Sequence, residues 1–209
     1  MKDLANLIKM YYYSVYAIRK SIGVIIVLSI VMSFWDTSLI PFSAALIVMG
    51  MTYSSAAYED KNKMNYLIYS LPVEPKRFVL SKYIYGFINT IISLVISNIL
   101  FLIIKNLSRG NTIDFGIVFI NSSVIFIGTV ITILVVPLAL IIGFEKGRFI
   151  IVFLAILPMC ITNSVSNSIK LPVINISTSM VILMAALILI TLTLISYFIT
   201  SNLYAKKEI

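Results

Sequence analysis

The stretch YIYGFINTIISLVISNILFLII, residues 83–104, decides the fold. It contains no Asp, Glu, Lys or Arg, and as an α-helix it would be about 33 Å long, enough to cross the ~30 Å hydrocarbon core of a bilayer. Further apolar runs occur at 21–35, 39–57, 115–144, 149–161 and 173–200. Together the six runs predict an all-α integral membrane protein with six transmembrane helices, forming a single domain over residues 1–209. Pro137 lies inside the long fourth run and predicts a kink there.

The composition agrees with a membrane domain and excludes several other classes. Of the 209 residues, 60% are hydrophobic and 11% charged, whereas about a quarter of a soluble domain is charged. The chain has no histidine and one cysteine, Cys160, so we expect neither a zinc site nor an internal disulfide. It also lacks a phosphate-binding G-x-x-x-x-G-K-[ST] loop. We therefore expect no catalytic residues and no cofactor on this chain.

The predicted spans lack ionisable side chains in their interiors. Ion-coupled transporters use such groups to carry protons or bind sodium, so this class is disfavoured. The polar residues within the spans are small or uncharged, and we expect most of them to be helix-packing contacts. They are Ser29, Ser33, Ser43, Asn89, Thr90, Ser93, Ser97, Asn98, Thr129 and Thr132.

The net charge of +8 is attributed to orientation in the membrane rather than to nucleic-acid binding. If the N-terminus is cytoplasmic, thirteen Lys and Arg residues fall on cytoplasmic segments and three, Lys105, Arg109 and Lys170, on outer ones. This bias predicts that both termini lie in the cytoplasm. It also supports an even number of spans.

Residues 1–20 are predicted to form an amphipathic interfacial helix on the cytoplasmic surface, with its tyrosines at the depth of the lipid headgroups. The apolar positions recur at helical spacing: Leu4, Leu7, Ile8, Tyr11, Val15 and Ile18. The alternative is a helix continuous with the first span.

Residues 58–82 form the one elaborate cytoplasmic loop. Asp60 can cap a short helix, which Pro72 would end. The apolar residues of this helix form one stripe, Met64, Leu67, Ile68 and Leu71. Pro75 suits the first turn of another helix, whose stem, residues 76–82, enters the third span. The stripe can lie against headgroups or dock into a groove on a soluble partner.

This loop carries a resemblance to a known family. An acidic pair, Glu59 and Asp60, is followed by an aromatic-rich short helix, by Ser-Leu-Pro-Val at 70–73 and by a basic stretch. The arrangement resembles the small permeases of ABC-2-type exporters, most closely the permease subunits of phenol-soluble-modulin exporters in Gram-positive bacteria. The resemblance covers the whole chain. It implies a bacterial plasma-membrane protein with a coupling helix that docks on a separate ATPase.

The resemblance also implies partners and site residues. Family permeases work as dimers, with a second copy or a paralogous permease, and the ATP and Mg²⁺ are bound by the partner ATPase. The residues implied at the ATPase-coupling interface are Glu59, Asp60, Lys61, Lys63, Met64, Leu67, Ile68 and Leu71, with Phe144, Glu145 and Lys146 as a second contact. The expected function is export of amphipathic or hydrophobic substrates such as peptides or lipids. The alternative is a non-transporting immunity or sensor protein that binds a peptide.

Overall fold

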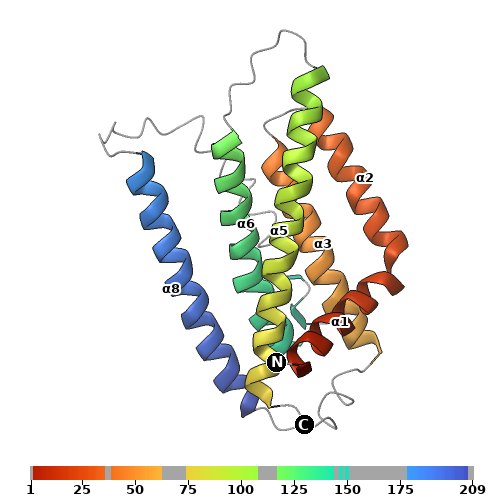
Figure 1. Cartoon of the computed structure of the whole chain (residues 1–209). Coiled ribbons are helices and arrows are strands. Elements are labelled where there is room, and N and C mark those ends of the chain that lie inside the picture. The colour runs from red at the N-terminus through yellow and green to blue at the C-terminus, as the bar shows by residue number, and fades with distance from the viewer. Residues whose placement is uncertain are drawn as a thin grey trace.

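The fold is a bundle of long helices, shown in Figure 1. The structure is a computed structural model that describes residues 2–35, 39–62, 74–107, 117–143, 146–147, 149–150 and 178–206. Its elements are α1 (Lys2–Ala17), α2 (Arg19–Trp35), α3 (Ile40–Lys61), α5 (Pro75–Leu107), α6 (Ile117–Pro137), the π-helix η2 (Leu138–Ile142) and α8 (Thr178–Ala205). The described part of the chain contains no β-strand, which confirms the all-α class.

Four helical segments are long and apolar enough to cross a membrane: α3, α5, α6 continued by η2, and α8. A fifth is possible if α1 and α2 are counted together as one broken span. The predicted fifth span, 149–161, lies outside the described residues apart from Phe149 and Ile150. The α6 and α8 helices run in the same direction, as they would if that span joined them (Figure 1). The count of six spans remains a prediction.

The N-terminal segment consists of two distinct helices, α1 and α2. The chain bends by 79° between α1 and α2, so the two are not one continuous helix. Leu7, Tyr11 and Ser14 form a buried face of α1, and this face packs on α3 and α5. Two residues of the predicted apolar stripe, Leu7 and Tyr11, are therefore buried against protein, and the other four are half-buried.

Small residues bring α5 and α6 close together. A Cβ on Gly86 would lie 2.4 Å from Cγ2 of Thr132, and a Cβ on Gly128 would lie 2.5 Å from Cγ2 of Thr90. Each helix thus offers a glycine to the threonine of the other, which is how small residues promote close helix packing in membranes.

Most of the polar residues predicted to be packing contacts are buried in the bundle. Ser33 donates to the hydroxyl of Ser43 at 2.8 Å, joining α2 to α3. Ser93 donates to the carbonyl oxygen of Ala44 at 2.8 Å, joining α5 to α3. Pro137 ends α6, and the π-helix η2 follows it.

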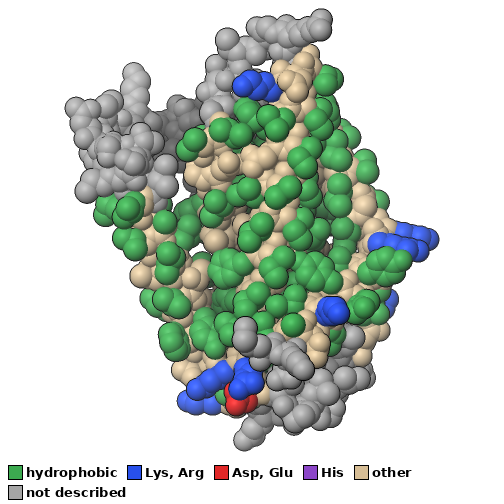
Figure 2. All heavy atoms as spheres, viewed as in Figure 1, with side chains coloured by type: hydrophobic (Ala, Val, Ile, Leu, Met, Phe, Trp, Pro, Cys, Tyr) green, Lys and Arg blue, Asp and Glu red, His purple; other side chains and the backbone are tan. Residues whose placement is uncertain are grey.

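One end of the bundle contains an aromatic-rich buried cluster. This cluster, hereafter the end cluster, combines residues of α1, α5, α6, η2 and α8: Leu7, Tyr11, Phe78, Val79, Tyr83, Tyr85, Val136, Leu140 and Tyr204. Figure 2 shows apolar side chains over the middle of one face and most of its Lys and Arg side chains toward this end. That charge distribution matches the end predicted to be cytoplasmic.

Candidate functional site

A buried ion pair joins the last turns of α3 to the first turns of α5. The Lys82 ammonium donates to both carboxylate oxygens of Glu59, and the side chains are only 9% and 5% exposed, respectively. Ser55, one turn before Glu59, also donates to Oε1 of Glu59 at 3.1 Å. The pair therefore clamps the two helices at the point where the loop between them begins and ends.

Aromatic rings surround the ammonium. Nζ of Lys82 lies 4.2 Å from the centroid of the Tyr11 ring and 5.8 Å from that of Phe78, distances at which cation–π attraction operates. The Tyr11 hydroxyl shares a hydrogen bond of 2.9 Å with Ser81. Burial, followed by the nearby Glu59 carboxylate, raises the pKa of Tyr11 well above its usual range. Tyr11 thus remains a neutral phenol and ties α1 to the ion pair.

A cavity of about 40 Å³ borders the pair. Its lining comes from α3, α5, α6 and η2, and includes Thr52, Glu59, Asp60, Lys82 and Tyr85. A space of this size with several polar groups can hold water. The pair is therefore enclosed by protein on the α1 side and bordered by a small polar space on the α6 side.

Because both charges are buried, the ion pair restricts how far α3 and α5 can move relative to each other. Each charge loses hydration inside the bundle, and the loss is compensated only while the partner and the surrounding hydrogen bonds stay in place. Separating α3 from α5 at this level would leave two buried charges without partners. The two helix ends are thus expected to move together.

The structure places some of the predicted coupling residues and leaves others outside its described part. Glu59 is buried, Asp60 lines the cavity, and Lys61 is exposed at the end of α3. Lys146 is exposed. Asp60, interpreted from sequence as a helix cap, lies in the last turn of α3 instead. Outside the described residues are Lys63, Met64, Leu67, Ile68, Leu71, Phe144 and Glu145.

Sequence reasoning missed the roles of Lys82 and Tyr11. Lys82 was counted only as a cytoplasmic charge, and Tyr11 only as part of an apolar stripe. The helical spacing in the sequence does indicate that both charged residues are buried. Glu59 continues the buried positions Val48, Thr52 and Ser55 of α3, and Lys82 lies four residues after Phe78 and four before Gly86 on α5. Both charges thus sit on the packing faces of their helices.

Comparison with known proteins identifies the family. The search of curated proteins and that of solved structures found no match. The family described as ABC-2 family transporter protein matches residues 6–205, from α1 to the end of α8. The match includes the buried ion pair and the four described helical segments that are long and apolar enough to cross a membrane. The chain therefore belongs to the ABC-2 transporter family, as a membrane permease of that family.

Proposed function

We propose that the chain is the permease subunit of an ATP-driven exporter that moves amphipathic or hydrophobic molecules out of a bacterial cell. It would act as a dimer, with a second copy or a paralogous permease, and with separate ABC ATPase subunits that bind ATP and Mg²⁺. Family membership supports the permease role and the ATPase partner. The observation that carries the coupling mechanism is the buried Glu59–Lys82 pair, which joins the two helices that flank residues 63–73.

The pair provides a route from the loop into the membrane. An ATPase that moves the loop would pull on both α3 and α5, because the ion pair prevents the helix ends from separating. The α5 helix is continuous over 33 residues, so a tilt at its cytoplasmic end is carried to its far end. The α6 helix follows through its Gly–Thr contacts with α5, and α1 follows through Tyr11.

The interior suits a substrate that needs no charged pocket. Among the described residues, Glu59 and Lys82 are the only buried Asp, Glu, Lys or Arg side chains, and they neutralise each other. The remaining buried polar groups of the spans are mostly Ser, Thr and Asn that bond within the bundle. An interior without an unpaired charge favours peptides, lipids or other amphipathic substrates over ions.

The coupling interface is tested at the predicted stripe Met64, Leu67, Ile68 and Leu71. Leu67→Asp with Ile68→Asp should abolish copurification of the ATPase from native membranes, since charges on an apolar docking face are costly. The matched control, Asn65→Asp with Ser70→Asp, adds the same charge off the stripe and should retain the ATPase. Both variants should insert normally.

Two results would contradict the proposal. Full ATPase recovery with the Leu67→Asp/Ile68→Asp variant would exclude the stripe as the docking face. Absence of any ATPase from the wild-type complex, together with tight peptide binding, would favour the immunity or sensor function.

A further inference from the structure

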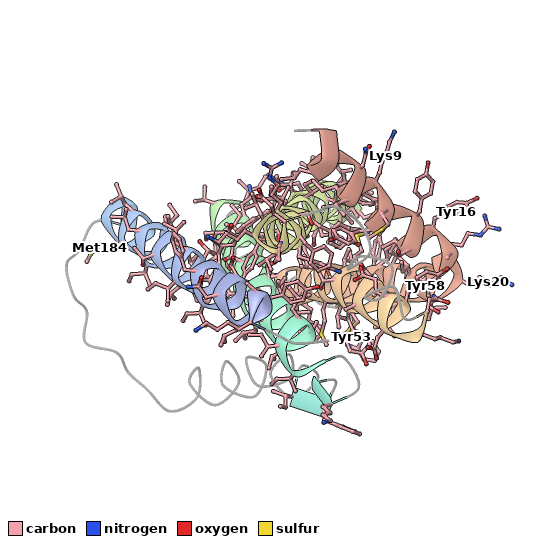
Figure 3. The ribbon with its side chains drawn as sticks, turned by 90° about the horizontal axis from the view of Figure 1, so that it is seen from below. Lys9, Tyr16, Lys20, Tyr53, Tyr58 and Met184 are labelled. Atoms are coloured by element: carbon pink, nitrogen blue, oxygen red, sulfur yellow. The ribbon has the colours of Figure 1, made fainter. Side chains whose placement is uncertain are left out.

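The outer face of α1 is basic and aromatic, and no described part of the chain covers it. The opposite face of α1 packs into the end cluster through Leu7 and Tyr11. On the outer face Tyr13 and Tyr16 are 70% and 64% exposed. Figure 3 shows Lys9, Tyr16 and Lys20 pointing outward at one edge of the molecule, on the same side as Tyr58 of α3.

This face includes a groove of about 350 Å³ between α1 and α3, hereafter the α1 groove. Its lining residues are Asn6, Lys9, Met10, Tyr13, Ser14 and Tyr58. An ammonium, an amide and two phenol hydroxyls can all donate hydrogen bonds, and the lining holds no carboxylate. The α1 groove is therefore suited to an anion.

The positive charge at this face is not neutralised by the described residues. Neither Lys9 nor Lys20 forms an ion pair with any described part of the chain. The Arg19 guanidinium donates to the Tyr16 hydroxyl at 2.7 Å and lies 4.9 Å from the centroid of that ring. These contacts hold the guanidinium without cancelling its charge.

We propose that the α1 groove binds the phosphodiester headgroup of an anionic phospholipid in the cytoplasmic leaflet. The groove lies along the part of α1 that precedes the 79° bend into α2, and lipid headgroups are the anions beside a helix at the membrane surface. Exposed tyrosines are typical of this depth in the membrane. The outward apolar residues of α2, among them Val24, Val27 and Val31, are 57–66% exposed and offer a surface for the acyl chains. The bound lipid would fix the angle of α1, and through Tyr11 the position of Lys82.

The test measures lipid adducts on the purified chain by native mass spectrometry, with phosphatidylglycerol and phosphatidylcholine as probes. We expect phosphatidylglycerol to bind more tightly than phosphatidylcholine. Lys9→Gln with Lys20→Gln should weaken phosphatidylglycerol binding about tenfold or more, since each Lys near a headgroup contributes ~1 kcal/mol. The matched control, Lys61→Gln with Lys76→Gln, removes the same charge from the same end of the bundle and should bind normally.

A second variant tests the hydrogen-bond donors of the α1 groove separately from the positive charge of this end of the bundle. Tyr13→Phe with Tyr58→Phe keeps the net charge and removes two donors, so phosphatidylglycerol binding should fall while phosphatidylcholine binding is unchanged. Equal binding of the two lipids by the wild type would overturn the proposal, as would equal losses in the Lys9/Lys20 and Lys61/Lys76 variants. Displacement of the lipid by millimolar inorganic phosphate or by polyglutamate would assign the groove to a soluble anion instead.

Discussion

Lys82 forms a buried ion pair with Glu59 across the base of the loop between α3 and α5, and the pair joins residues 23 positions apart in sequence. The same ammonium lies against the ring of Tyr11, so three helices meet at one charge. The arrangement places a buried ion pair next to the segment proposed to receive the ATPase. Conformational changes in the loop should therefore depend on this pair.

Removing one member of the pair should destabilise the chain. Glu59→Gln leaves the Lys82 ammonium without a counter-ion, and Lys82→Met leaves the Glu59 carboxylate without one. Each should lower the free energy of unfolding by about 3 kcal/mol. The measurement is thermal or denaturant unfolding of the purified chain in detergent.

The double variant and an exposed pair provide the controls. Glu59→Gln with Lys82→Met leaves no buried charge. The double variant should therefore lose less free energy of unfolding than the sum of the losses in the two single variants. Glu74→Gln removes the exposed pair with Arg77, whose atoms are 3.1 Å apart, and should change stability little. Additive losses in the double variant would show that the two side chains act independently.

Because α5 and α6 lie close together, replacing a glycine between them should destabilise the chain. Gly86→Ala would place a methyl group 2.4 Å from Cγ2 of Thr132, so the helices must separate, at a cost of about 1–3 kcal/mol. Adding Thr132→Ala removes the clashing atoms and should recover most of the stability. Gly23→Ala, where no atom lies within 4 Å of the new Cβ, is the neutral control. Wild-type stability of Gly86→Ala in the same unfolding assay would contradict the packing described here.

The helical fold could be predicted because hydropathy dominates it. The runs 39–57 and 83–104 became the centres of α3 and α5, and Pro75 begins α5 as predicted. The span boundaries stay predictions, but α3 continues to Lys61, beyond the predicted end of the apolar run at residue 57. Glu59 and Lys82 remain inside the helical bundle since each supplies the other's counter-ion, and this pairing is not visible in either segment alone.

The candidate site was only partly predictable for the same reason. The sequence indicated the segment and its acidic residues, but it placed Glu59 at an exposed docking surface, whereas the Glu59 side chain is buried. Its coupling role stays a prediction, now through α5 and not through direct exposure. The apolar stripe of α1 was correct in spacing, whereas its covering by α3 and α5 depended on packing between distant segments.

Both termini are predicted to be cytoplasmic. Cysteines introduced at Lys2 and Lys207 in a Cys160→Ser background should resist impermeant maleimide in intact cells and react after the membrane is opened. A cysteine replacing Arg109, on a predicted outer segment, should react in intact cells and serves as the positive control. Labelling of only one terminus would mean an odd number of spans.

The energy source separates the transport hypotheses. The described spans offer one buried ion pair and no unpaired buried carboxylate, lysine or arginine, so coupling to a proton or sodium gradient lacks an obvious carrier. Reconstituted with its ATPase in liposomes, the chain should drive accumulation of an amphipathic peptide that requires ATP and is insensitive to proton ionophores. A hydrolysis-deficient ATPase should abolish this transport. Glu59→Gln should reduce transport more than ATP hydrolysis, because it loosens the connection between the loop and α5 without altering the ATPase. Transport by the permease alone along an ion gradient would instead assign Glu59 and Lys82 to ion coupling and favour a secondary transporter.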